Sequence, residues 1–143
     1  MILRHEAIEE RFKELDTIIQ ELGKYSDISW DAFNSSLSQQ WIVERGLIAA
    51  ASLIFDVADH ILAGNFGDYA QTYGESLAKL HDQGILSAEL YGQMKGLSGF
   101  RNILIHAYLE IDPQEVYENF HKALKVFPQY IREVLAWLKD SGG

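Results

Sequence analysis

Hydrophobic side chains recur every three or four residues along most of this chain of 143 residues. That spacing places them on one side of an α-helix, whereas a half-buried β-strand would show strict alternation, and no alternating run of any length occurs. Only two prolines are present. The first helix is predicted over residues 8–22, where Ile8, Phe12 and Leu15 begin the apolar stripe, and Gly23 follows as its stop.

The rest of the pattern predicts a bundle. Further helices are expected over residues 31–62, over residues 69–81, from Ser87 onward, and from Asp112 to residue 138, with a turn at residues 65–68. The second of these is apolar on nearly every side beyond Leu47, which is typical of a central helix. The predicted fold is therefore all-α, an up-and-down bundle of four to five helices in a single domain over residues 1–143.

The start and course of the last helix follow from particular residues. Asp112 is placed as an N-cap, Pro113 as the first helical residue and Glu115 three residues after the cap. This start forces a break after the preceding helix. Within the last helix, Pro128 is expected to cause a bend.

Composition narrows the possible chemistry and location. The chain has no cysteine, which removes thiol catalysis, zinc–thiolate sites and disulfides, and which fits a cytosolic protein. Its most apolar run, residues 47–55, is far shorter than the roughly 18 residues that a membrane span needs, and its first residues lack a signal-peptide pattern. We therefore expect a soluble, cytoplasmic protein with no membrane partner.

The charge balance argues against broad nucleic-acid binding. Twelve Lys and Arg against 21 Asp and Glu give a formal net charge of -9 at pH 7. A general nucleic-acid binder needs an extended basic face. Any contact with RNA must therefore be local, and the acidity otherwise serves solubility or attracts a basic partner.

Four hydrogen-bonding side chains interrupt an apolar stretch in the second half of the chain: Arg101, Asn102, His106 and Tyr108. Packing does not explain them, because each one buried without a partner costs roughly 1–3 kcal/mol. Arginine offers a planar fork of donors to phosphate oxygens, and histidine titrates near neutral pH. On a helix Asn102 and His106 share one face, the long Arg101 side chain can swing toward the imidazole, and Tyr108 falls near the helix end. The cluster predicts acid–base chemistry on a phosphate.

The spacing of Arg101, His106 and Tyr108 resembles the Arg-X4-His-X-Tyr signature of the HEPN superfamily, and specifically of the HepT toxin family of small all-helical proteins. Residues 44–62, 69–80 and 110–113 are also similar to that family, so the resemblance covers most of the chain. It implies a HEPN-like helical fold. It also implies the toxin of a toxin–antitoxin pair, a metal-independent endoribonuclease that acts on tRNA or mRNA.

The resemblance further implies roles and partners. Arg101 and His106 are expected to be catalytic, with Asn102 orienting the imidazole or contacting a phosphate oxygen. One chain supplies only part of the acid, base and cationic groups that RNA cleavage requires, so a homodimer through the motif helix is expected. No cofactor or metal is expected. The partner would be a cognate MntA-like nucleotidyltransferase antitoxin, which silences the toxin by adding AMP to Tyr108.

Less specific interpretations stay open. Arg101 can pair on the surface with an acidic neighbour such as Glu110, and His106 can be an interfacial histidine without a catalytic role. Asp56 and His60, four residues apart, can face a metal, although Asp56 is better interpreted as possible support for the motif across the bundle. The whole protein can also be a non-catalytic HEPN partner that binds nucleotide or substrate for a nucleotidyltransferase.

Overall fold

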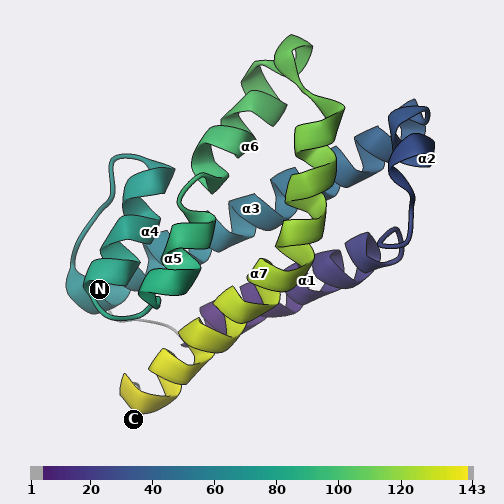
Figure 1. Ribbon diagram of the computed structural model, residues 1–143. Coiled ribbons are helices and arrows are strands. Elements are labelled where there is room, and N and C mark those ends of the chain that lie inside the picture. The colour runs from purple at the N-terminus through teal and green to yellow at the C-terminus, as the bar shows by residue number, and fades with distance from the viewer. Residues whose placement is uncertain (1–4, 142–143) are drawn as a thin grey trace.

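The computed structural model describes residues 5–141, which form seven α-helices and one 3₁₀ turn without any β-strand (Figure 1). The predicted all-α class is therefore confirmed. In chain order the elements are α1 (His5–Gly23), α2 (Trp30–Asn34), α3 (Leu37–Phe66), α4 (Tyr73–Asp82), α5 (Ala88–Met94), α6 (Leu97–His106), the 3₁₀ turn η1 (Tyr108–Glu110) and α7 (Pro113–Ser141).

The first helix follows from its apolar stripe, as predicted. The five buried residues of α1 are those of the predicted stripe: Ile8, Phe12, Leu15, Ile19 and Leu22. The helix ends at Gly23. Its buried face packs mainly against α3 and α7.

The helix predicted over residues 31–62 is divided near its start. Ser29 and Ser36 are the N-caps of α2 and α3, and each hydroxyl accepts a hydrogen bond from the backbone N–H three residues later. A serine that satisfies the first N–H groups of a new helix competes with continuation of the previous one. At its other end α3 extends to Phe66, and Gly67 stops it in the left-handed conformation with φ of 59°.

The next two predicted helices also start or break at small polar residues. Thr72 caps α4, which begins at Tyr73 and therefore later than predicted. Ser87 caps α5 as expected. The helix then breaks at Lys95 and Gly96, so the motif lies on a separate helix, α6. Because two of the predicted helices are each divided in two, the helices outnumber the expected four or five.

The last helix begins and bends where the sequence indicates. The Asp112 carboxylate accepts a hydrogen bond from the backbone N–H of Gln114 at 3.0 Å, and Pro113 is the first helical residue. Pro128 lies inside α7 and has no N–H for the preceding turn. Figure 1 shows α7 changing direction midway along its length, which agrees with the bend expected at Pro128.

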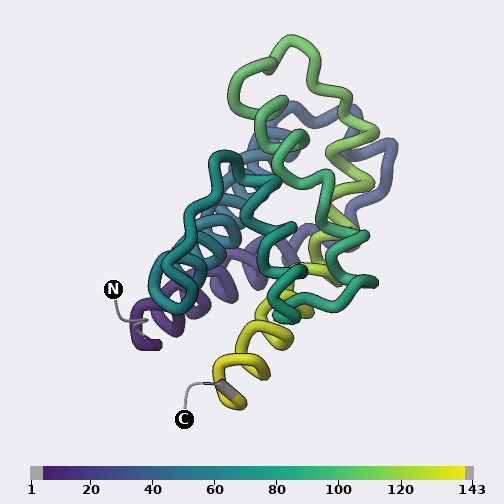
Figure 2. The backbone as a smooth tube through the Cα atoms, turned by 90° about the vertical axis from the view of Figure 1, so that its left-hand side faces the viewer, coloured from purple at the N-terminus to yellow at the C-terminus, as the bar shows by residue number. Residues whose placement is uncertain are grey.

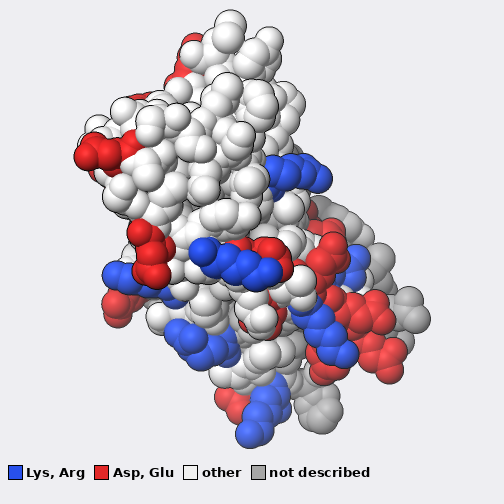
Figure 3. Space-filling view, turned by 90° about the vertical axis from the view of Figure 1, so that its right-hand side faces the viewer, with Lys and Arg blue, Asp and Glu red and all other residues white. Residues whose placement is uncertain are grey.

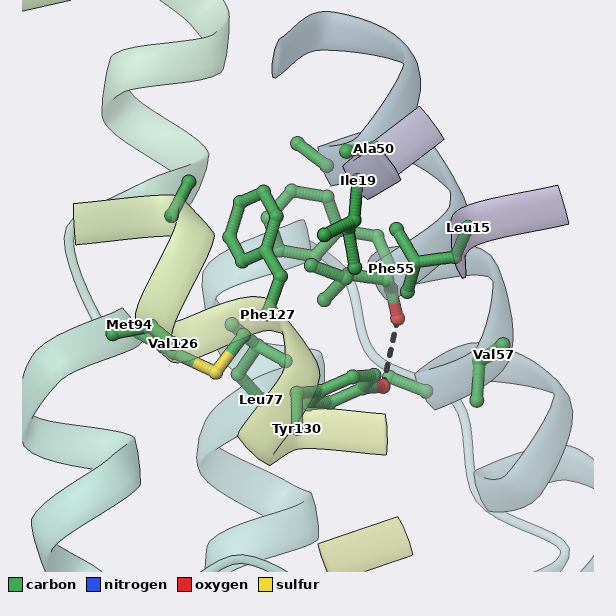
Figure 4. Packing of buried hydrophobic residues seen from close by; sticks show 14 of the residues in the cluster. Leu15, Ile19, Ala50, Phe55, Val57, Leu77, Met94, Val126, Phe127 and Tyr130 are labelled. Atoms are coloured by element: carbon green, nitrogen blue, oxygen red, sulfur yellow. Dashed lines mark hydrogen bonds between the residues drawn. The ribbon is translucent and has the colours of Figure 1, made fainter. Parts of the chain in front are cut away.

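The hydrophobic core is built around α3, which contacts α1, α2, α4, α6 and α7. Figure 4 shows Ile19 of α1, Phe55 of α3 and Phe127 of α7 pointing into the same interior. The fully buried Tyr130 of α7 donates a hydrogen bond to the carbonyl of Ile54 at 2.9 Å. Burial, together with the negative charge of a nearby aspartate, raises the pKa of the Tyr130 phenol far above its ordinary value, so the hydroxyl stays a donor.

The composition of α3 is explained by this central position. An 18-residue window of α3 reaches a mean hydropathy of 1.6, which by length and composition alone would suit a membrane span. Half of that window is buried inside the protein. A core helix of a globular bundle has the same character, because neighbouring helices cover it on most sides.

The arrangement of the helices leaves the end of α6 open. Figure 2 shows α4, α5 and α6 together on one side of α3. The η1 turn lies at the opposite end of the molecule from the start of α1 and the end of α7 (Figures 1 and 2). The segment that follows the motif helix is consequently exposed, with Tyr108 and Leu109 both open to solvent.

Candidate active site

The motif helix α6 uses only part of its surface for packing. Leu104 is its buried residue, and Leu97 and Phe100 are partly buried against the core. The helix packs against α3 and α4. It ends at His106, because Ala107 leaves the helical conformation. The polar residues of the motif therefore occupy the sides and the end of α6 that the core does not cover.

Arg101 is half-buried and is held by two neighbours from other helices. Its Nε donates a hydrogen bond to the Ser52 hydroxyl of α3 at 3.0 Å. Its guanidinium carbon lies 5.1 Å from the centre of the Tyr73 ring, a distance at which a cation attracts an aromatic face. Among residues 5–141, no carboxylate lies within 4.0 Å of this guanidinium, so the surface ion pair with Glu110 does not form.

His106 and Tyr108 are both exposed at the end of the motif helix. His106 is the last residue of α6, and Tyr108 opens η1 with 69% of its surface accessible. Within the described part of the chain neither side chain has a hydrogen-bond, ion-pair or ring partner. Because Arg101 is directed toward α3 and α4, the structure does not bring its guanidinium to His106 within one chain.

Asn102 lies beside a surface hollow. The hollow has a volume of about 360 Å³ and is lined by Asn102, Asp59, Thr72 and Tyr73, among others. Asn102 is exposed, and no hydrogen bond links it to another of the residues that the structure describes. Its amide is thus free to meet a ligand, and it does not contact the His106 imidazole here.

Asp56 lies across the bundle and pairs with α1. Its carboxylate accepts a hydrogen bond from Nε of Arg11. It also lines a second hollow, of about 370 Å³, together with Ser52, Asp59 and Tyr73. No contact joins Asp56 to the motif residues, so the expected support for the motif does not take the form of a direct hydrogen bond.

Asp59 lines both hollows, which lie next to each other at Tyr73. Burial raises the pKa of the Asp59 carboxyl, and the negative charge of Asp56 raises it further. The neighbouring His60 has a buried Nε2 without a hydrogen-bond partner. Over residues 5–141, no group of three or more His, Cys, Asp or Glu side chains is suited to hold a metal ion, so Asp56 and His60 lack a third ligand there.

Sequence reasoning missed three residues of this region: Ser52, Asp59 and Tyr73. Ser52 carries a usable signal, because it is a lone hydroxyl in the most apolar run of the chain and a buried polar group usually has a specific partner. Tyr73 carries no such signal. Its contacts with Phe55 and Arg101 come from helices distant in sequence, and no spacing rule connects them.

A further cavity lies on another side of the motif helix, between α6 and α7. Its volume is about 430 Å³, and its lining combines apolar side chains such as Phe100, Ile103 and Phe127 with the charged Glu118 and Lys122. None of the four motif residues lines it. Arg101 and Asn102 therefore lie on the side of α6 that faces Tyr73, whereas His106 and Tyr108 lie at its exposed end.

Known proteins match this chain over most of its length. Residues 15–134 match the family described as Ribonuclease HepT-like. The tRNA nuclease HepT of Aphanizomenon flos-aquae (strain 2012/KM1/D3) is 35% identical over 131 residues, which cover 92% of this chain and 89% of that protein.

Solved structures share the fold. The tri-AMPylated HEPN toxin of Shewanella oneidensis, solved in complex with an MNT antitoxin, gives a TM-score of 0.84 at 23% identity and covers 93% of this chain and 99% of its own. YutE of Bacillus subtilis, described as a cytosolic protein of unknown function, gives a TM-score of 0.82 at 18% identity, with 100% and 97% of the two chains covered. The family match and the 35% identical relative together show that this chain belongs to the Ribonuclease HepT-like family of HEPN proteins.

Proposed function

We propose that this chain is the toxin of a HEPN/nucleotidyltransferase toxin–antitoxin pair and acts in the cytoplasm as an endoribonuclease on tRNA or mRNA. The observation that carries the proposal is the Arg101 guanidinium, which is half-buried, held from two sides and without a carboxylate partner in the described chain. A cation in that state suits a phosphate group. The similarity to a tRNA nuclease supports RNA as the source of that phosphate.

The proposed reaction is cleavage by the neighbouring ribose hydroxyl. A base removes the proton of the 2′-hydroxyl, whose oxygen attacks the adjacent phosphorus, and an acid donates a proton to the departing 5′-oxygen. The products are a 2′,3′-cyclic phosphate and a 5′-hydroxyl end. Arg101 stabilises the negative charge of the pentavalent phosphorus, and His106 acts as base or acid because an imidazole nitrogen can accept or donate a proton. Asn102 contacts a phosphate oxygen or orients the imidazole.

A homodimer through the motif helix would complete this set of groups. One chain has a single His106, whereas the reaction needs both an acid and a base, and a two-fold axis at α6 would pair two motifs. Exposed apolar side chains support such an interface: Leu109 of η1 is 88% exposed, and Leu37, Trp41 and Ile42 are exposed at the start of α3. Figure 3 shows few charged side chains on the upper part of the face that it draws, and two acidic chains can approach with less repulsion through a surface of that kind.

Tyr108 is the residue proposed for silencing by the antitoxin. After a base of an MntA-like nucleotidyltransferase removes the proton of its exposed phenol, the phenolate oxygen would attack the α-phosphorus of ATP, with pyrophosphate leaving and AMP becoming attached to the oxygen. The adduct adds an anionic phosphodiester and a nucleoside two residues from His106, where it would exclude the phosphate of RNA. The related toxin solved with AMP groups and an MNT antitoxin supports this form of control.

Expression of the chain without its antitoxin, followed by inspection of total RNA, tests the ribonuclease proposal. Wild type should arrest growth and cleave RNA, and cleavage by the purified protein should persist in EDTA. Arg101→Ala and His106→Ala should each abolish cleavage while the circular dichroism of the helices is unchanged. Arg132→Ala, at an exposed position of α7, is the matched control and should cleave as wild type does. Normal cleavage by His106→Ala would contradict the assignment, and intact RNA with wild type would favour the non-catalytic binding partner instead.

Two further measurements test the assembly and its control. Sedimentation should show a dimer at micromolar concentration, and a mixture of Arg101→Ala and His106→Ala chains should recover part of the activity if one cleft needs one intact copy of each group.

Incubation with the cognate nucleotidyltransferase and ATP should add about 329 Da per AMP group. Tyr108→Phe should cleave RNA and escape both the mass gain and the silencing. AMP on a different residue would refute the role of Tyr108.

A further inference from the structure

The Ser52 hydroxyl has a fixed direction, which gives its contact with Arg101 a defined geometry. The hydroxyl donates its one proton to the carbonyl of Ile48 at 2.8 Å, within α3. Its lone pairs are left to accept, and Nε of Arg101 donates to them at 3.0 Å. Because α3 is the central helix of the bundle, this acceptor is anchored in the core.

The Tyr73 ring is anchored in the same way. It stacks on Phe55 with the ring centres 4.8 Å apart and an angle of 15° between the planes. Phe55 is 1% exposed and belongs to α3, whereas Tyr73 is 43% exposed at the start of α4. The Arg101 guanidinium lies over the same ring, with its carbon 5.1 Å from the ring centre. A guanidinium over an aromatic face is stabilised by the ring's negative potential.

These two contacts restrain the guanidinium while they leave its outer edge free. Ser52 uses the Nε–H, and Tyr73 uses the face of the group, so the N–H donors of Nη1 and Nη2 remain without a partner among the described residues. The Nη pair presents parallel donors at the spacing that two oxygens of one phosphate require. A lysine in this place would not provide the paired parallel donors of a guanidinium.

We propose that Tyr73 and Ser52 are positioning residues that hold Arg101 with both Nη groups directed outward to receive the phosphate of the RNA substrate. This inference rests on the proposed ribonuclease function. Neither residue touches the reacting atoms. Tyr73 acts through its ring and not through its hydroxyl, and that distinction makes the proposal testable.

Cleavage of total tRNA by four purified variants tests the proposal. Tyr73→Phe keeps the ring and should retain wild-type kcat/KM, whereas Tyr73→Leu keeps an apolar contact with Phe55 and should lose about tenfold, the size expected for a partly buried cation–π contact. Ser52→Ala, which preserves the helix, should lose about threefold to tenfold. Tyr69→Leu is the matched control, because Tyr69 is an exposed tyrosine of the loop just before α4 and has no contact to Arg101. It should leave the rate unchanged.

Nitrogen-15 NMR of the arginine Nε–H groups supplies a readout that does not depend on activity. The Arg101 Nε–H proton should show a ring-current shift in wild type and in Tyr73→Phe, and should lose it in Tyr73→Leu. If Tyr73 did not hold the guanidinium over its ring in solution, the wild-type proton would show no such shift and would not move in Tyr73→Leu. Ser52→Ala should shift the same Arg101 Nε–H resonance, because it removes the acceptor of that proton. The NMR spectra therefore test the geometry even where a variant is too unstable for kinetics.

The outcomes separate this inference from the proposed function. If Arg101→Ala cleaves tRNA as wild type does, the proposed function fails. If Arg101→Ala is inactive but Tyr73→Leu and Ser52→Ala cleave normally, the positioning role is refuted while the function stands. A loss in Tyr73→Phe equal to that in Tyr73→Leu would assign a direct role to the hydroxyl and would also overturn the proposal.

Discussion

Replacing Gly46 with alanine tests how closely α1 and α3 approach each other. A Cβ at Gly46 would lie 2.5 Å from Cδ2 of Leu22 and 3.1 Å from its Cγ. Leu22 is 3% exposed, so the surrounding core limits its movement. Alanine inside a helix is about 1 kcal/mol more favourable than glycine, whereas overpacking a core costs about 1–3 kcal/mol. We therefore expect Gly46→Ala to lower the free energy of unfolding by about 1 kcal/mol.

Thermal and urea unfolding at one fixed protein concentration measures this effect. A loss of about 1 kcal/mol corresponds to about 2–4 °C in a chain of this size. Leu22→Ala should itself cost about 2–5 kcal/mol, but it removes the carbons that collide, so Gly46→Ala should become stabilising in that background. Gly92→Ala, in the open surroundings of α5, is the matched control and should stabilise by up to about 1 kcal/mol. Equal stabilisation by Gly46→Ala and Gly92→Ala in the wild-type background would refute the close-contact reasoning.

Three further substitutions have expected effects on unfolding. Tyr130→Phe should lower the free energy of unfolding by about 1 kcal/mol at all pH values below 9, because it removes the hydrogen bond to the Ile54 carbonyl. An unchanged urea unfolding curve would show that this hydrogen bond makes no net contribution to stability. Asp59→Asn should raise the free energy of unfolding at pH 7. Burial raises the pKa of the Asp59 carboxyl in the folded chain above its value in the unfolded chain, so wild type loses stability as the pH rises through the folded pKa, whereas the neutral asparagine does not. The gain should shrink toward pH 4, and a gain independent of pH would exclude this cause. Glu133→Gln should have the opposite effect. Hydrogen bonds from Ser87 and from Gln129 outweigh burial and lower the pKa of the Glu133 carboxyl in the folded chain. Wild type should therefore be more stable than the variant at pH 7, and the two stabilities should converge in acid.

The sequence predicts the long helices well and their divisions poorly. The stripe of α1 and the start of α7 depend on local patterns, namely apolar spacing and the Asp112–Pro113 pair, and both agree with the structure. The breaks at Ser36 and Gly96 depend on which of two local conformations the tertiary contacts favour. A serine can cap a helix or lie within one, so its presence alone does not decide between them.

The candidate site shows the same division between local and tertiary information. The spacing of Arg101 and His106 locates the motif on a helix and at its end, because that information is carried within ten residues. The direction of the Arg101 side chain depends on Ser52 and Tyr73, which belong to other helices, and the sequence pattern suggested instead that it could swing toward His106. Only the packing of α3, α4 and α6 decides between these directions.

The restraint on Arg101 also bears on the proposed function, in which an acidic protein acts on RNA. A chain with net charge -9 repels a polyanion at long range, so its affinity must come from a few contacts at short range. A freely rotating arginine would lose conformational entropy on binding phosphate, and in an acidic protein it could instead pair with a surface carboxylate. Ser52 and Tyr73 contact the guanidinium, and among residues 5–141 no carboxylate pairs with it. Under the proposed function, preorganisation of this cation is a physical means by which a chain without long-range attraction can favour the phosphate in the transition state.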